Sequence, residues 1–257
     1  MKKILLNFFG QLRFWDLQDT IEPFKNYFVE QGYKVTIHGT FWDDEYVKKF
    51  NNKNKLYIFD KLNLVEEPNL EPLTLQKYFY SLEKSCTLIN DEYDLIISSR
   101  PDIFFKITKQ KHTLSNLLNN VKNDEIYVQK EHYQNKNHKY EKHMWWIDDK
   151  IFISNQYTLN KISQAFKYYI DKRFNFDLEY HYGLVWVLDF FNIKIINDVE
   201  FFRINMIRHW LYSQYPHEGG YQIGDNLVRN IEKKYQDTDK WIEYIKKVQK
   251  IQNHLTD

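Results

Sequence analysis

The sequence predicts a single α/β domain with a mostly parallel central sheet flanked by helices. Short apolar runs of strand length alternate with segments of helical periodicity along most of the 257 residues. The first run ends at Gly10 and is followed by a helical segment and a second run, as expected of a right-handed βαβ unit. A later run ends abruptly at Pro101, which lacks an N–H and therefore ends regular strand pairing.

The individual elements follow from local periodicity. Residues 4–9 form an apolar run that predicts the first strand, and residues 34–38 predict the second. Between them, residues 21–32 have helical spacing, with Thr20 as the candidate N-cap and Gly32 as the stop. The later predicted elements are a helix from residue 75, strands at 95–97, 125–128 and 150–154, helices at 159–170 and 178–190, and strands at 193–196 and 199–204.

The carboxyl-terminal part is expected to be an extension of this domain. We assign residues 1–225 to the α/β domain and residues 226–257 to a helical extension packed on it, because residues 241–251 have amphipathic helical spacing. Residues 130–143 are polar and rich in Lys, His and Asn, which predicts a loop.

Composition and charge exclude several classes of protein. Thirty-six Lys and Arg against thirty-five Asp and Glu give a formal charge of +1, which argues against a nucleic-acid partner. The single cysteine, Cys86, excludes an internal disulfide, favours a cytoplasmic location and is expected to be an inert thiol on the apolar face of a helix. No segment reaches the length of a membrane span, and peripheral membrane contact remains compatible with the sequence.

The first candidate site is the Gly10-Gln11-Leu12-Arg13 stretch directly after the first strand. Gly10 permits a tight turn, Gln11 could then approach a nucleotide, and Arg13 could serve as a forked donor to phosphate. A glycine turn beside a solvated arginine is the simpler interpretation of this stretch when it is taken alone.

The second candidate site is the Arg100-Pro101-Asp102 stretch at the end of a predicted core strand. Ligands bind outside the carboxyl ends of strands in open α/β sheets. Asp102 offers a hard oxygen ligand for Mg²⁺ or Mn²⁺, and Arg100 adds a positive charge for a diphosphate. The competing interpretation is an Arg–Asp ion pair with a purely structural role. The rigid proline between the two residues favours a role in ligand binding.

The third candidate site combines Trp145 and Trp146 with Asp148 and Asp149, just before a predicted strand. Aromatic faces pack on the apolar side of a sugar ring and carboxylates accept hydrogen bonds from its hydroxyls, although core tryptophans beside a solvated turn would look the same. The nearby histidines do not have zinc-site spacing and no cysteine assists them, so zinc is rejected; they are His132, His138 and His143.

Several motifs in order resemble the GT-A-fold glycosyltransferases of bacterial surface-polysaccharide loci and large DNA viruses. They are Gly-Gln-Leu-Arg at residues 10–13, IHGTFWD at 37–43, Tyr-Asp-Leu-Ile-Ile-x-x-Arg-Pro-Asp at 93–102, Asp-Lys-Ile-Phe-Ile-Ser at 149–154 and a helix opening with Glu179. The resemblance covers roughly residues 1 to 200 and implies a GT-A-like (Rossmann-like) catalytic domain.

The resemblance also implies roles for individual residues. Asp102 corresponds to the ligand of the metal and the diphosphate, while Arg100 stands where the commoner Asp-x-Asp motif has its first acid. Asp149 corresponds to the acid near the donor sugar and acceptor, and Glu179 to a second acid of the same cleft. The implied cofactor is Mn²⁺ or Mg²⁺. The implied partners are a nucleotide-sugar donor and a glycan or lipid-linked glycan acceptor.

Two other functions remain open at this point. A nucleotidyltransferase acting on a sugar phosphate would share the sheet and the metal, but it usually needs a glycine-rich, basic phosphate loop. A non-catalytic module that binds nucleic acid or glycan is compatible with the Lys and aromatic residues interleaved at 130–140, although the neutral charge counts against nucleic acid. If the enzyme inverts the anomeric centre, Asp149 is the first candidate for the general base, ahead of Glu179 and Asp148.

Overall fold

A computed structural model describes residues 1–12, 17–44, 47–48, 55–69, 75–101, 103–107, 114–130, 147–174, 183–196 and 202–206. The strands are β1 (Lys3–Gly10), β2 (Lys34–Trp42), β3 (Lys61–Val65), β4 (Leu95–Ser99), β5 (Ile103–Ile107), β6 (Glu125–Lys130), β7 (Ile147–Ser154), β8 (Lys194–Ile196) and β9 (Phe202–Met206). The helices are α1 (Leu17–Glu30), α3 (Leu75–Cys86), α4 (Leu114–Asn120), α5 (Gln156–Ser163), α6 (Ala165–Ile170) and α7 (Gly183–Phe190), with a 3₁₀ turn η1 (Lys55–Ile58).

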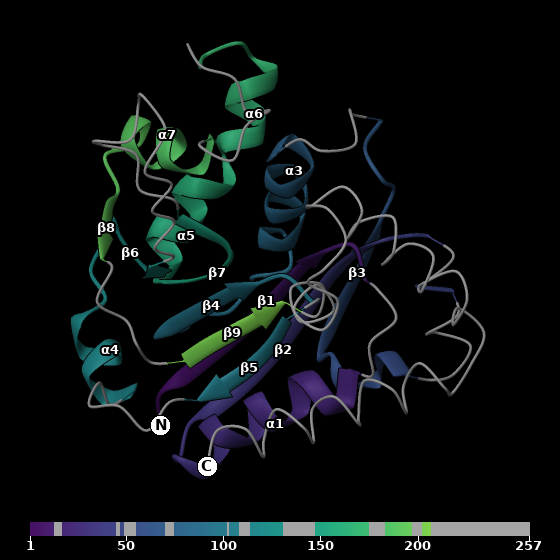
Figure 1. The fold of residues 1–257 in the computed structure, drawn as a ribbon, viewed down its shortest axis with the longest axis vertical. Coiled ribbons are helices and arrows are strands. Elements are labelled where there is room, and N and C mark those ends of the chain that lie inside the picture. The colour runs from purple at the N-terminus through teal and green to yellow at the C-terminus, as the bar shows by residue number, and fades with distance from the viewer. Residues whose placement is uncertain are drawn as a thin grey trace, which may run out of the picture.

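The protein is a mixed α/β structure built on a seven-stranded, mostly parallel sheet in the order β3-β2-β1-β4-β7-β6-β8 (Figure 1). The first four strands in this order are parallel to one another. Strand β7 is antiparallel to both of its neighbours, β4 and β6, and β8 is parallel to β6. Only β7 therefore opposes the common direction within this sheet, which confirms the predicted fold class.

Helices cover both faces of the sheet, with α1 and α4 below it and α3, α5, α6 and α7 above it in the view of Figure 1. The alternation of β1 divides the core into two apolar clusters. Leu6 and Phe8 belong to the cluster that includes Phe24 and Phe28 of α1. On the other face, Leu5 and Phe9 belong to the cluster that includes α3, α5 and α7. Both faces of the central strands are buried, as expected for a parallel sheet.

Most predicted elements are present, and several boundaries differ. Helix α1 starts at Leu17, so Thr20 lies inside it and the predicted N-cap is wrong. Gly32 does end this helix, with φ of 83° and its N–H bonded to the Val29 carbonyl at 2.9 Å. The helix predicted over 159–170 is two helices, α5 and α6, that meet at Gln164.

Besides the 3₁₀ turn η1, three described elements were not predicted from the sequence. Strand β3 is short and carries alternating polar and apolar residues at the sheet edge, and helix α4 has only seven residues. Strand β5 leaves the main sheet and pairs with β9 as an antiparallel ribbon. The predicted helix over 241–251 and the boundary between residues 1–225 and 226–257 lie outside the described residues.

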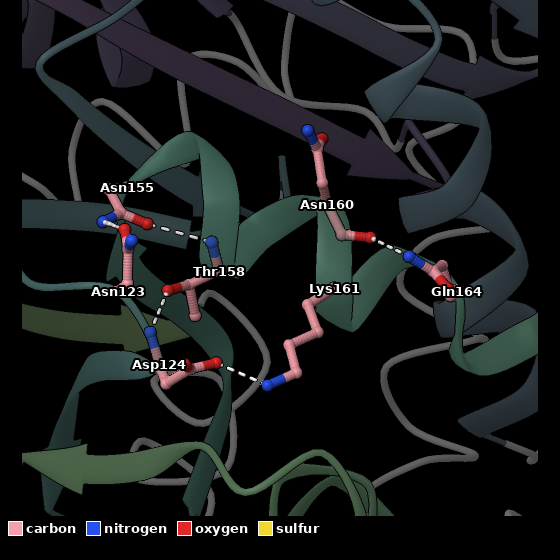
Figure 2. Close-up of polar contacts among 7 residues, drawn as sticks. All are labelled: Asn123, Asp124, Asn155, Thr158, Asn160, Lys161 and Gln164. Carbon is pink, nitrogen blue, oxygen red and sulfur yellow. Dashed lines mark hydrogen bonds and ion pairs between the residues drawn. The ribbon is translucent and has the colours of Figure 1, made fainter.

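A polar cluster joins the start of β6 to the start of α5 (Figure 2). Asn155 is the N-cap of α5, because its Oδ1 accepts from Thr158 N at 2.9 Å, and its Nδ2 donates to Asn123 Oδ1 at 2.8 Å. Asp124 has a left-handed φ of 59°, and its N–H donates to Thr158 Oγ1 at 2.9 Å while its carboxylate pairs with Lys161. These polar groups bind one another, so the cluster is a structural joint between strand and helix.

Gly39 of β2 provides the first testable prediction. A Cβ at this position would lie 2.6 Å from Phe41 Cε2 and 2.8 Å from Phe59 Cδ1, and these two buried rings already pack edge to face. We expect Gly39→Ala to lower the free energy of unfolding by about 1–3 kcal/mol because the rings must move in a packed core. Urea unfolding measures this loss. Gly32→Asn is the control and should cost less, since Asn tolerates a positive φ and no atom lies within 4 Å of the added Cβ. An unchanged midpoint for Gly39→Ala would contradict the packing seen here.

Candidate functional site

The carboxyl ends of β1, β2, β3 and β4 meet at one edge of the sheet because these four strands are parallel and adjacent. Gly10 at the end of β1 pairs with Phe41 of β2, and Phe8 pairs with Ser99 at the end of β4. The first two predicted site stretches, which follow Gly10 and Ser99, therefore begin side by side. Parallel sheets bind their ligands at such an edge.

Gly10 ends β1 in a conformation that favours glycine, with φ of 107°. The next residue, Gln11, is half-buried and donates from Nε2 to Asp44 Oδ2 at 3.3 Å. Asp44 lies just beyond the end of β2, and its other carboxylate oxygen accepts from Val47 N at 3.0 Å. The loops after two neighbouring strands are thus joined at the candidate site.

Trp42, the last residue of β2, is held in place by helix α3. Its indole Nε1 donates to Ser81 Oγ at 3.0 Å, and the Lys77 ammonium lies 5.4 Å from the ring centroid. Lys77 also pairs with Glu67 Oε1, beyond the end of β3, at 2.6 Å. Trp42, Asp44 and Lys77 were not assigned roles from the sequence. The sequence signal for Trp42 is the IHGTFWD stretch at residues 37–43, and Asp44 directly follows this stretch.

Arg100 and Pro101 mark the point at which the chain leaves the main sheet. Ser99 is the last residue of β4, Pro101 is buried, and β5 begins at Ile103 in a separate ribbon that contacts α1. Arg100 is half-buried, and its carbonyl oxygen accepts from Ser99 Oγ at 3.0 Å. A proline suits this place because the residue no longer needs to donate to a strand neighbour.

The start of β7 reaches the same edge from the opposite direction. Because β7 is antiparallel to β4 and Ile151 pairs with Ser99, the residues that precede Ile151 lie at the carboxyl end of β4. Strand β7 begins at Ile147 rather than at the predicted residue 150, so Asp148 and Asp149 both belong to it. The topology therefore brings Asp149 to the same edge as Gly10, Gln11 and Arg100.

The remaining predicted site residues fall outside the part of the chain that the structure describes. These residues are Arg13, Asp102, Trp145, Trp146 and Glu179. Asp102 stands between two described neighbours, Pro101 and Ile103, and so belongs to the connection between β4 and β5. The predicted loop over 130–143 also lies outside the described residues, apart from Lys130 in β6.

A metal ion at this edge would need His, Cys, Asp or Glu side chains as ligands. Among the described residues, no three His, Cys, Asp or Glu side chains gather closely enough to hold a metal ion. Asp44 already accepts a hydrogen bond at each carboxylate oxygen, from Gln11 Nε2 and from Val47 N. Asp102 is a carboxylate of the type that Mg²⁺ and Mn²⁺ prefer, so its chemistry fits a divalent cation.

Cys86 takes no part in this site. Burial raises the pKa of its thiol to about 12, which outweighs the lowering by hydrogen bonding with Ser163 and Ser85. The thiolate is the reactive form, and this thiol stays protonated at neutral pH. The expectation of an inert cysteine is therefore supported.

His38 of β2 is fully buried, and burial, followed by the positive charge of Lys61, lowers its pKa to about 4; Asp60 and Asp91 oppose this shift. The Tyr93 ring packs edge-on against the imidazole. The unfolded chain takes up this proton near pH 6.5, whereas the folded protein does so only near pH 4. The full stability is thus present above pH 6.5, and about 3 kcal/mol should be lost as the pH falls from 6.5 to 4.

Urea unfolding of wild type and His38→Gln between pH 7 and pH 4 tests this predicted loss of stability. The glutamine variant lacks the titrating group, so its stability should fall less steeply over that interval. Carboxylates titrate in both proteins, and the comparison removes their contribution. Parallel stability curves would show that His38 does not carry this pH dependence.

Comparison with known proteins finds similarity among solved structures. No family model matches the chain, and no curated protein matches it. A solved glycosyltransferase involved in the glycosylation of the major capsid of PBCV-1 superposes with a TM-score of 0.43 and 10% identity, over 77% of this chain and 83% of that one. A TM-score at this level does not establish a shared fold. In the part of the chain that is described, no helix is both long and apolar enough to cross a bilayer.

Proposed function

We propose that this protein is a glycosyltransferase that moves a sugar from a nucleotide-diphosphate sugar to a hydroxyl group of a glycan or lipid-linked glycan. The observation that carries the proposal is the convergence of three chemically distinct stretches at one sheet edge. They are the Gly10-Gln11 turn, the exit of the chain at Arg100-Pro101, and the start of β7 with Asp149. A tight turn and a positively charged side chain suit the binding of a diphosphate donor, and a carboxylate suits the activation of a hydroxyl acceptor.

Each stretch has a separate task in this proposal. The turn after β1, with Gln11 and then Arg13, binds the nucleotide part of the donor, and Asp44 holds Gln11 in position. Arg100 offers a positive charge to the diphosphate. Asp149 accepts the proton of the acceptor hydroxyl if the reaction inverts the anomeric centre, and Glu179 supports the sugar or takes over this role.

A divalent cation is part of the proposal through Asp102. When bound, Mn²⁺ or Mg²⁺ would neutralise the charge that develops as the nucleoside diphosphate leaves. Arg100, which directly follows the end of β4, would share this task. Arg100 and the cation would both place positive charge at the diphosphate. The first acid of an Asp-x-Asp motif is therefore not needed at position 100.

Thermal unfolding of the whole chain with a panel of nucleotide sugars, with and without Mn²⁺, tests the function. A ligand that binds only the folded protein at a hundred times its Kd stabilises it by about 2.7 kcal/mol, which gives a clear rise in Tm. We expect a diphosphate sugar to raise Tm, and more so with the metal. Stabilisation by nucleoside triphosphates with sugar phosphates alone would instead indicate a nucleotidyltransferase. Stabilisation by nucleic acid that falls steeply with salt would indicate a binding module.

A further inference from the structure

Three neighbouring strands place polar side chains side by side inside the core. Asn7 of β1 is the register partner of His38 on β2 and of Ser98 on β4, and all three residues have 0% exposure. Register partners point to the same face of a sheet. This face is the one under α3, because Asn7 Nδ2 donates to Ser85 Oγ of that helix at 2.9 Å. We call Asn7, His38 and Ser98 the polar row.

The polar row has hydrogen-bonding capacity that the described protein atoms do not use. Among the described residues, none bonds to Asn7 Oδ1, to either ring nitrogen of His38 or to Ser98 Oγ. Thr40 Oγ1 on β2 and Ser154 Oγ on β7 are also buried without a hydrogen-bond partner among the described residues. The large majority of buried side-chain polar atoms in proteins are hydrogen-bonded, and each buried group left without a bond costs about 1–3 kcal/mol. The four unbonded atoms of the polar row lie at one level of the sheet, and they therefore indicate a bound partner.

We propose that the polar row is an internal hydration site in which at least one ordered water molecule bridges Asn7, His38 and Ser98. The chemistry of the row selects water over ions. The amide oxygen of Asn7 only accepts, a neutral imidazole has one donor and one acceptor, and a serine hydroxyl does both. A cation cannot satisfy the imidazole N–H, and an anion cannot satisfy the amide oxygen. A small molecule that donates and accepts satisfies all of them.

The charge state of His38 agrees with this choice. Burial lowers the pKa of His38 to about 4, so the imidazole is neutral at physiological pH. A single internal water supplies hydrogen bonds without supplying the bulk hydration that an imidazolium needs.

The proposed water would have a structural consequence. It would link β2, β1 and β4 laterally, and the Asn7–Ser85 hydrogen bond extends the link to α3. Ser85 Oγ in turn donates to the Leu82 carbonyl at 2.8 Å, within the same helix. The docking of α3 on the sheet would thus rest on a hydrated polar contact as well as on Phe79 and Leu82.

A crystal structure of the whole chain, at a resolution that shows ordered water, decides this proposal. We expect density at hydrogen-bond distance, about 2.7–3.2 Å, from Asn7 Oδ1 and from a His38 nitrogen or Ser98 Oγ. Continuous packing, with the three side chains bonded to one another and no density between them, overturns it.

Two matched variants show whether the row itself holds the water. Ser98 and Ser99 are adjacent buried serines on opposite faces of β4. Ser98→Val puts a methyl group beside the row, so the density next to residue 98 should disappear, whereas Ser99→Val should leave it in place. Density that survives Ser98→Val unchanged would mean that the row does not hold the water. If a valine variant does not fold, the wild-type structure still decides the proposal.

Discussion

Replacement of Asp102 by Asn should lower the rate of sugar transfer by about a hundredfold or more, which corresponds to a few kcal/mol of lost transition-state stabilisation. Asp102 belongs to the connection where the chain leaves β4 for the β5–β9 ribbon. This connection starts at the sheet edge that also carries Gly10 and Gln11. An amide keeps the size of the side chain but removes the negative charge that a divalent cation needs.

The measurement is turnover with the donor found in the thermal panel, at several concentrations of Mn²⁺. The control is Asp91→Asn, which removes an acid at the amino-terminal side of β4, where its side chain is 60% exposed and pairs only loosely with Lys61 at 3.4 Å. Asp91→Asn should retain normal turnover. If Asp102→Asn retained it as well, with an unchanged dependence on Mn²⁺, Asp102 would not be the metal ligand.

Asp149 and Asp148 should differ strongly in their effects on transfer. Both lie in β7, and successive residues of a strand point to opposite faces. Asp149 is nearer than Asp148 to Ile151, which pairs with Ser99 at the end of β4. It also opens the Asp-Lys-Ile-Phe-Ile-Ser stretch of the resemblance. Of the two acids, Asp149 is therefore the one that we expect to act in transfer.

We expect Asp149→Asn to lower transfer by about a hundredfold or more while donor binding persists, since general-base catalysis contributes roughly 10²–10⁴-fold. Asp148→Asn is its matched control and should be mild. Turnover and donor affinity, measured for both variants, separate a lost base from a lost binding contact. Equal losses, or a larger loss for Asp148→Asn, would place the base one residue away from our assignment.

Local patterns in the sequence were sufficient for the fold class and for the position of the candidate stretches. Apolar runs of strand length predicted β1, β2, β4 and β6, because a strand buried on both faces is apolar throughout. Gly10 and Pro101 marked where two of these strands end, since one permits a positive φ and the other cannot donate to a neighbour.

Elements that lack such local signals were missed. Strand β3 is an edge strand with exposed Leu62 and Leu64, and its alternating sequence does not stand out from a polar segment. Strand β5 gains its partner β9 only through pairing between residues about a hundred positions apart. Periodicity reports the shape of a segment, and it contains no information on which distant segment completes its hydrogen bonds.

The sequence by itself determined the alternation of strands and helices, the turn at Gly10 and the end of β4 at Pro101, because each of these depends on the conformational limits of nearby residues. Only the tertiary structure decided that β7 inserts antiparallel between β4 and β6 and so brings Asp149 to the edge where Gly10 and Arg100 lie. It also decided that Asp44 bonds to Gln11 and that Asn7, His38 and Ser98 share one buried level. Strand order and register follow from the packing of two apolar faces across the whole chain, and no local stretch of residues encodes them.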